Sequence, residues 1–201
     1  MDYFPLNERY AGFYLADVAG HGAASAFVTA ILTTLVGKYR QALPLQGDET
    51  ILHPLQLLTG LDQDLQALSI AKHVTMFYAV VDLPTGSLVY GNAGAFPHPI
   101  LASGAETSEL ECSGRPLNLP GRAGFGSGEA RLRPGDRLLL ASDGVLELAP
   151  RLTHRQRREQ LRAALAQARN LEDITGPLGL ADHTSLRDDV ALLFLHHQEK
   201  P

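Results

Sequence analysis

Aspartates that adjoin short apolar segments are the residues of this sequence best suited to chemistry. Asp17 and Asp143 each follow such a segment, and the adjacent pair Asp188 and Asp189 precedes the last one. An aspartate at the end of a buried strand is held by rigid backbone at the rim of a sheet. Carboxylates gathered there repel one another unless a cation neutralises them. Because oxygen ligands suit hard cations, the pattern indicates a site for Mg²⁺ or Mn²⁺.

Each of these aspartates also has a simpler interpretation. Taken alone, Asp143-Gly144 favours an ordinary turn. Asp17 could accept backbone hydrogen bonds in its own loop, and Asp188 with Asp189 could mark a solvent-exposed entry to the last strand. The metal interpretation rests on the three sites together, and the residues alone leave both interpretations open.

The elements that must position these residues follow from the apolar pattern. Apolar and aromatic runs indicate strands, and longer runs with a helical period indicate helices. Strands joined by tight turns, such as Pro84-Thr85-Gly86, run antiparallel. The fold class is therefore α+β, an antiparallel β-sheet sandwich flanked by helices. We expect strands over 10–16, 74–82, 87–90, 98–102, 137–142 and 190–195, and helices over 23–42, 52–69 and 152–168.

Three details of this scheme can be checked against a structure. Leu43-Pro44 should end the first long helix, because proline cannot continue the hydrogen-bond pattern. The segment 103–129 is rich in glycine and should be rich in loops. The arginines of the last helix should face solvent: Arg155, Arg157, Arg158 and Arg162.

The composition limits the class of protein and its partners. The chain has 201 residues, a net charge of −5 and 45% hydrophobic residues, which suits one globular domain. Basic residues are scattered except over 151–169, which argues against a nucleic-acid partner. The longest apolar stretch, 23–36, is too short to span a membrane. A single cysteine, Cys112, suits the reducing cytoplasm.

A series of motifs along the chain resembles a known family. The series resembles the SpoIIE-type phosphatases, the bacterial branch of the metal-dependent type 2C (PPM) protein phosphatase superfamily, over about residues 2–195. The resemblance implies a type 2C-like fold, a serine/threonine protein phosphatase activity and two bound Mn²⁺ or Mg²⁺ ions. The motifs are Asp17-Val18-Ala19-Gly20-His21-Gly22, Thr75-Met76-Phe77-Tyr78-Ala79, Tyr90-Gly91-Asn92-Ala93-Gly94, Gly135-Asp136-Arg137, Ser142-Asp143-Gly144-Val145 and Asp188-Asp189-Val190.

The resemblance also assigns roles to single residues. Asp17 would bridge both metal ions, and the Val18 carbonyl would be a further ligand. Asp143 and Asp188 would complete one metal site, with Asp188 preferred over the adjacent Asp189. The resemblance implies that a water bound between the two ions attacks phosphorus, in line with the departing serine or threonine oxygen.

His21 is a candidate general acid for the departing alkoxide, since imidazole titrates near neutrality. A loop histidine at a helix start is the equally open alternative. Domains of this family are often outputs of response regulators of the RsbU or RssB kind. The resemblance therefore implies a phosphorylated regulatory protein as substrate, such as an anti-sigma antagonist, an upstream receiver or sensor domain, and a possible homodimer.

Three departures from the family pattern open an alternative function. Of the family's Gly-Gly-Asp-x-x-Asp element only Asp2 is present, so we expect 1–201 to be a single domain, the C-terminal fragment of a longer protein, without its first strand and that strand's acid. Ala95 stands where the family commonly has histidine, and an arginine-rich helix over 151–162 replaces a Phe-Gly block. The alternative is a catalytically weak or inactive adaptor with the phosphatase fold that binds a sigma factor or its antagonist.

Overall fold

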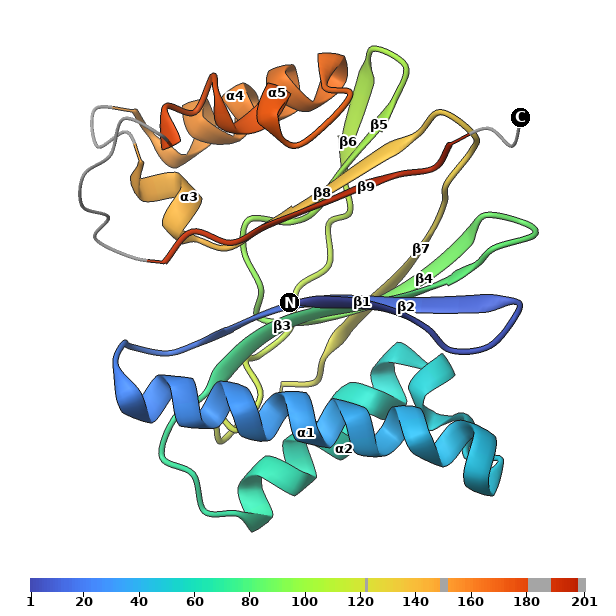
Figure 1. Ribbon diagram of the computed structural model, residues 1–201. Coiled ribbons are helices and arrows are strands. Elements are labelled where there is room, and N and C mark those ends of the chain that lie inside the picture. The colour runs from blue at the N-terminus through green and yellow to red at the C-terminus, as the bar shows by residue number, and fades with distance from the viewer. Residues whose placement is uncertain (122, 149–151, 181–188, 199–201) are drawn as a thin grey trace. The chain divides into compact units, whose positions relative to one another are not determined.

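The chain divides into two compact units, each with its own antiparallel sheet (Figure 1). The structure is a computed structural model and describes residues 1–121, 123–148, 152–180 and 189–198. The first unit comprises Met1–Ala95 and Cys112–Arg131, and the second comprises Phe96–Glu111 and the chain from Leu132 onward. The predicted α+β class with antiparallel sheets is confirmed, and a single domain over 1–201 stays a prediction.

The first unit holds a five-stranded sheet in the order β1-β2-β3-β4-β7, antiparallel throughout. Its central strands are rich in aromatic and β-branched residues, which fit a pleated and buried surface. The strands are β1 (Asp2–Pro5), β2 (Tyr10–Val18), β3 (Val74–Asp82), β4 (Ser87–Ala93) and β7 (Gly126–Arg131). Between β2 and β3 come α1 (Ala23–Gln46), the short 3-10 helix η1 (Glu49–Leu52) and α2 (Pro54–Ala67).

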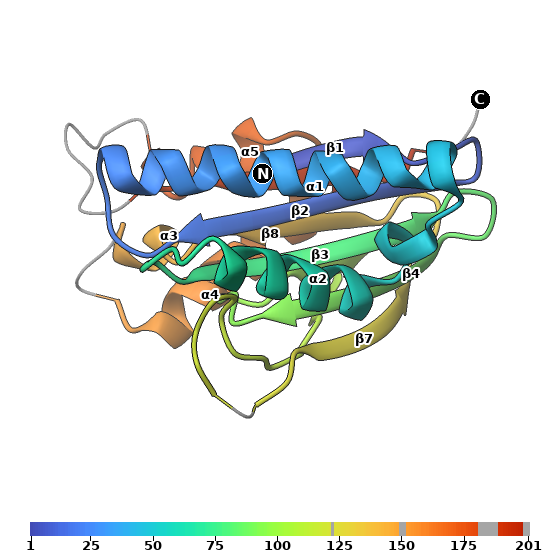
Figure 2. The same ribbon diagram turned by 90° about the horizontal axis from the view of Figure 1, so that it is seen from below.

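Helices α1 and α2 cover one face of this sheet (Figure 2). Buried apolar residues recur at helical spacing on both helices: Val28, Leu32 and Val36 on α1, and Leu57, Leu58, Leu61 and Leu65 on α2. They pack on alternate residues of β3, including Met76 and Tyr78. The approach is close, since a Cβ at Gly91 of β4 would lie 2.8 Å from Leu58 Cδ1. Glycine at this position therefore allows α2 to pack on the sheet.

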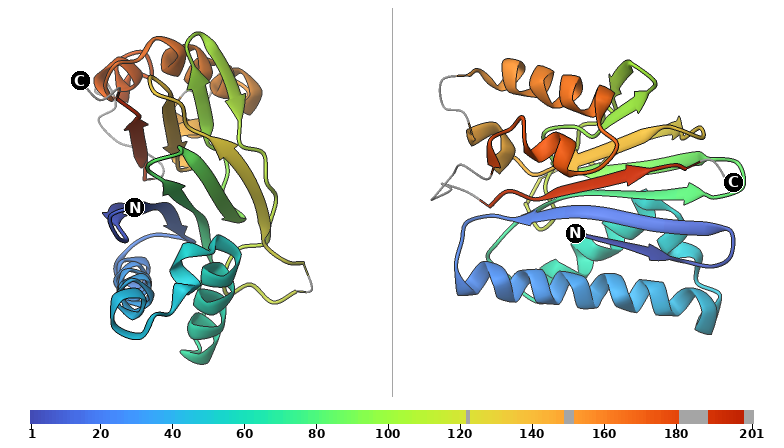
Figure 3. Two further views of the ribbon diagram at one scale, coloured as in Figure 1. Left: turned by 90° about the vertical axis from the view of Figure 1, so that its right-hand side faces the viewer. Right: turned by 45° about the horizontal axis from the view of Figure 1, so that its top comes forward.

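The second unit holds a four-stranded antiparallel sheet in the order β6-β5-β8-β9. Its helices α4 and α5 lie on one side of the sheet (Figure 3). Buried Leu161 and Leu165 of α4 share a core with Ile100 and Leu139 of the sheet. The elements are β5 (Ile100–Ser103), β6 (Glu106–Glu109), β8 (Arg137–Ala141), α3 (Gly144–Glu147), α4 (His154–Gln167), α5 (Glu172–Thr175) and β9 (Leu192–His196).

Strand β1 lies at the edge of the first sheet. Residues 2–5 form β1, which pairs antiparallel with β2 from Asp2 opposite Tyr14 to Pro5 opposite Ala11. The expectation that the chain lacks the family's first strand and that strand's acid stays a prediction.

The segment 103–129 is rich in loops as predicted, but it also contains one strand and the start of another. Residues 106–109 form β6, an edge strand in which exposed and half-buried side chains alternate. Residues 126–131 form β7, and a Cβ at Gly128 would lie only 2.4 Å from the ring of Tyr90 on the adjacent strand. Polar residues and glycine therefore reflect an edge position and a close contact, although both are typical of loops.

The expectation that Leu43-Pro44 ends the first long helix is wrong. Helix α1 continues through Pro44 to Gln46 and is capped by Gly47, which has a left-handed backbone (φ 67°). The Gly47 amide donates to the Leu43 carbonyl. A proline in the last turn forgoes a hydrogen bond without stopping the helix. Among the described residues, no helix is long and apolar enough to cross a membrane.

The arginines of α4 do not form a solvent-exposed face. Arg157 is only 2% exposed, and Arg158 pairs with Glu109 of β6 over 2.7 Å. The Arg162 guanidinium donates to the Thr107 hydroxyl and carbonyl. Only Arg155 lies fully on the solvent side. The basic stretch thus anchors α4 to the edge strand of its own sheet.

Candidate active site

Asp17 lies near the end of β2, on the sheet face opposite α1 and α2. Tyr14, Ala16 and Val18 pack toward the helices. Successive side chains of a strand alternate between the two faces, so Asp17 projects from the other face. The residue is half-buried and lies opposite Thr75 of β3. The strand therefore sets the position of Asp17 and the sheet face from which its side chain projects.

The backbone carbonyl of Val18 turns away from β3. The Ala19 amide donates to the His73 carbonyl over 3.1 Å, so Ala19 occupies a hydrogen-bonded position of the ladder. Such positions alternate along an antiparallel pair, and the neighbouring Val18 therefore directs its carbonyl to the β1 side. The Val18 carbonyl, one residue after Asp17, is thus not used in the ladder between β2 and β3.

A tight turn carries the chain from β2 into α1 and holds His21. Gly20 and Gly22 have φ of 80° and 86°, a left-handed backbone that residues with side chains avoid. The Ser25 hydroxyl donates to the Gly20 carbonyl over 2.8 Å and closes the turn. His21 is exposed between the two glycines, directly before the helix that begins at Ala23. The amides in the first turn of a helix can bind an anion, and the catalytic role of His21 stays a prediction.

In the second unit, a hydrogen-bonded bracket joins the end of β8 to the chain before β9. The Ser142 hydroxyl accepts from the Ala191 amide over 2.8 Å and donates to the Asp189 carbonyl over 3.1 Å. A Cβ at Gly144 would lie 2.4 Å from that same carbonyl oxygen. Exposed Asp143 sits between Ser142 and Gly144, so this bracket places it beside exposed Asp189. Backbone contacts thus join the segments that carry Asp143 and Asp189, and the binding of one ion by their carboxylates stays a prediction.

The other predicted contacts remain predictions. Asp17, Val18 and His21 belong to the first unit and Asp143 to the second, while Asp188 lies outside the described residues. Within the described ranges, no group of three or more His, Cys, Asp or Glu side chains could hold a metal ion. Two observations nevertheless fit an all-oxygen site: the Val18 carbonyl outside the ladder, one residue after Asp17, and the bracket around Asp143.

The structure adds residues that the sequence analysis did not assign. Ser142 and Gly144 belong to a quoted motif, but only their contacts with the distant chain before β9 show what they do. Lys72, whose ammonium donates to the Ala19 carbonyl over 2.6 Å, carries no sequence signal at all. A hollow of about 850 Å³ between α4 and α5, lined in part by Gln167, Arg169 and Glu172, contains none of the predicted site residues.

The fold of this chain is that of PP2C-like protein phosphatase domains, and acids at strand ends are the candidate site residues. The PP2C phosphatase domain of SpoIIE from Bacillus subtilis has the same fold, with a TM-score of 0.75 at 15% identity over 96% of this chain and 56% of that one. A Mycobacterium tuberculosis protein with RsbU and RsbW domains gives a TM-score of 0.79 at 26% identity, over 98% of this chain and 54% of that one.

The chain belongs to the SpoIIE family. The family model described as Stage II sporulation protein E matches residues 7–198. The phosphoserine phosphatase RsbU of Bacillus subtilis is 28% identical over 148 residues, which are 72% of this chain and 42% of that relative. The chain therefore spans less than half the length of this curated relative. These findings confirm the prediction of a SpoIIE-type serine/threonine protein phosphatase domain.

Proposed function

We propose that the chain hydrolyses phosphoserine or phosphothreonine on a regulatory protein in bacterial signalling. The observation that carries this proposal is the bracket of Ser142 and Gly144, which joins the backbone after β8 to the Asp189 carbonyl before β9. Carboxylates on these two joined segments would suit a hard divalent cation. Membership of the SpoIIE family and the similarity to a phosphoserine phosphatase support hydrolysis of a phosphate ester as the reaction.

The metal site would form from oxygen atoms of this chain. Asp17 would bridge two ions, with the Val18 carbonyl as a further ligand. Asp143 and Asp188 would complete one site, and Asp189 is the neighbouring candidate. Two Mn²⁺ or Mg²⁺ ions held by these residues would activate a water and neutralise phosphate charge. The protein's own contribution is the fixed placement of these oxygens by β2 and β8.

His21 would donate a proton to the departing serine or threonine oxygen. Its exposed position between two glycines, at the start of α1, leaves the ring accessible to a bound phosphoprotein. A phosphate at the same helix start would also face free backbone amides. Replacement of His21 by Gln should therefore lower kcat for a substrate with a poor leaving group more than for an aryl phosphate.

Sigma-factor control is the setting that we propose for this activity. The relative RsbU is a phosphoserine phosphatase, and the Mycobacterium tuberculosis structure contains an RsbU domain and an RsbW domain. A phosphorylated antagonist of an anti-sigma factor is the corresponding substrate. An upstream receiver or sensor domain would supply the signal, a homodimer would be a suitable assembly, and the single buried thiol, Cys112, suits the cytoplasm.

An adaptor that has lost catalysis is the second candidate, and position 95 favours it. Ala95 is buried, and Asn92 holds its backbone on both sides, through the Ala95 amide over 2.7 Å and the carbonyl over 3.1 Å. The family's usual histidine would give this fixed position a polar group, and alanine gives none. A lack of Mn²⁺ binding at millimolar concentration in the full-length protein would favour the adaptor.

The test is phosphate release from phosphoserine, phosphothreonine and phosphotyrosine peptides with Mn²⁺ or Mg²⁺. We expect turnover of the first two peptides and its loss in Asp17→Asn. Glu8→Gln is the matched control, because Glu8 is an exposed acid in the turn between β1 and β2. Unchanged turnover in Asp17→Asn would contradict the metal assignment. Parallel Asp188→Asn and Asp189→Asn variants decide which of these two acids binds the ion.

A further inference from the structure

The loop that follows Asp17 is fixed by a lysine from a distant part of the chain. Both backbone polar groups of Ala19 are engaged by consecutive residues: the amide by the His73 carbonyl over 3.1 Å, and the carbonyl by Lys72 Nζ over 2.6 Å. A hydrogen bond from an ammonium is charge-assisted and stronger than one between neutral groups. Gly20 leaves room for this contact, since a Cβ there would lie 3.0 Å from Lys72 Nζ.

Lys72 is itself held in place by the side chain of Asn118. The Asn118 amide nitrogen Nδ2 donates to the Ile70 carbonyl over 2.6 Å and to the Lys72 carbonyl over 2.9 Å. Leu117 and Val74 exchange backbone hydrogen bonds of 2.8 and 3.1 Å beside it. The backbone that carries the lysine is therefore fixed from two sides, unlike that of an ordinary surface lysine.

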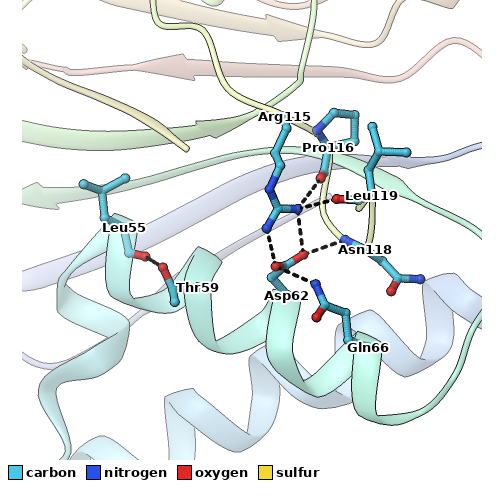
Figure 4. A network of polar contacts seen from close by, with 8 residues as sticks. All are labelled: Leu55, Thr59, Asp62, Gln66, Arg115, Pro116, Asn118 and Leu119. Carbon is cyan, nitrogen blue, oxygen red and sulfur yellow. Dashed lines mark hydrogen bonds and ion pairs between the residues drawn. The ribbon is translucent and has the colours of Figure 1, made fainter. Parts of the chain in front are cut away.

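The contacts continue from Asn118 to helix α2 (Figure 4). The Asn118 backbone amide donates to the Asp62 carboxylate over 2.7 Å. Both terminal nitrogens of the Arg115 guanidinium donate to the same carboxylate. Burial alone would raise the pKa of Asp62. The hydrogen bonds from Arg115, Asn118 and Gln66 and the charge of Arg115 outweigh burial and lower that pKa below its ordinary value. Asp62 thus stays ionised and keeps this part of the network together.

We propose that Lys72 is a positioning residue that holds the Ala19 carbonyl and thereby the direction of the Val18 carbonyl and the Asp17 carboxylate. The inference rests on the proposed function, because those two groups are the expected ligands of the ions. An immobilised lysine loses side-chain freedom, so such a contact persists only where it is well supported. Here the support comes from α2 and from the segment 115–118.

The decisive comparison is Lys72→Met against Lys72→Arg, with Lys38→Met as the matched control. Methionine keeps an unbranched stem of similar length but cannot donate, whereas arginine can. Lys38 pairs with Asp64 over 3.1 Å on exposed surface, away from the Ala19 contact. Loss of a group that orients a ligand typically weakens metal binding by about 10–100-fold.

Two measurements on the full chain are needed. Hydrogen exchange of the metal-free chain should show faster exchange in the peptide covering Asp17–Gly22 for Lys72→Met. Calorimetry should show the Kd for Mn²⁺ raised by about tenfold or more in the same variant. Lys72→Arg should recover most of both effects, and Lys38→Met should show neither.

Each contrary result has a distinct meaning. Unchanged exchange in Lys72→Met overturns the proposal, and so does faster exchange with unchanged Mn²⁺ affinity. A raised KM for phosphopeptide with normal exchange and metal affinity would make Lys72 a substrate contact instead. If the wild-type chain binds no Mn²⁺, the proposed function fails, while the exchange result still decides whether Lys72 holds the loop.

Discussion

Replacement of Gly144 by alanine tests how the chain holds Asp143 beside the segment before β9. Gly144 is the first residue of α3 and is buried. A Cβ at this position would lie 2.4 Å from the Asp189 carbonyl oxygen, 3.0 Å from its carbonyl carbon and 3.4 Å from Val190 Cγ2. The first two contacts are with backbone, which cannot turn aside as a flexible side chain could.

The size of the effect follows from these distances. Non-bonded heavy atoms are at their optimum about 3.5–4.0 Å apart, so the segment must move by about 1 Å. Overpacking of this kind costs about 1–3 kcal/mol, and the better helix propensity of alanine returns about 1 kcal/mol. We expect Gly144→Ala to lower the free energy of unfolding by up to about 2 kcal/mol. Mn²⁺ affinity should fall as well, because the moved segment carries Asp189.

The matched control is the same substitution at Gly37 in α1. A Cβ there would meet no atom within 4 Å, so alanine should raise stability by about 0.5–1 kcal/mol. Urea unfolding of the wild-type chain and both variants gives the two free-energy changes, which should have opposite signs. A Gly144→Ala variant as stable as Gly37→Ala would refute the steric argument.

The remaining predictions concern the first unit. Asp62→Ala leaves the guanidinium of Arg115 without its buried partner and should lower the free energy of unfolding in urea by about 3–5 kcal/mol. Asp64→Ala, at the more exposed pair with Lys38, should lower it by less than about 1 kcal/mol. Because the pKa of Asp62 is lowered in the fold, its contribution is full above the unfolded value near 3.8 and is lost as pH falls below it. Unfolding measured from about pH 5 to 2 should therefore lose less stability in Asp62→Asn than in the wild type, and equal losses would contradict the pKa argument. Tyr78→Phe removes the hydroxyl that donates to the Ile51 carbonyl over 2.7 Å and should cost about 1–3 kcal/mol.

The central strands could be predicted because their sequence pattern reflects burial. β2, β3 and β8 are apolar runs, and the sequence analysis places each within a few residues of its observed bounds. The edge strands β6 and β7 could not be predicted in the same way. Their residues are polar or glycine because one edge meets solvent and because Gly128 must approach Tyr90 closely.

The arginines of α4 show a second limit of sequence patterns. A basic helix face is usually exposed, yet Arg158 and Arg162 bind Glu109 and Thr107 of β6. The sequence around β6 is typical of loops, so it does not predict a strand that could bind these arginines. The side of α4 that faces the protein therefore could not be predicted without the strand.

The candidate site divides in a similar way. Asp17, Asp143 and the pair before β9 were found because each acid adjoins an apolar strand. Ser142 and Gly144 act through a segment almost fifty residues away in the chain, with Ser142 and Asp189 in direct contact. Lys72 reaches Ala19 across a still longer separation. No local pattern encodes such contacts, because they depend on how the strands pair.

Calorimetric titration of Mn²⁺ into this chain and into Asp143→Asn, with phosphopeptide turnover measured on the same samples, tests the central claim most directly. The account predicts that the wild-type chain binds Mn²⁺ and releases phosphate, and that both properties are lost in the variant. Binding without turnover in the wild type would show a metal site that is not catalytically competent in this chain. Absence of both in the wild type, or their persistence in Asp143→Asn, would contradict the metal-dependent phosphatase assignment.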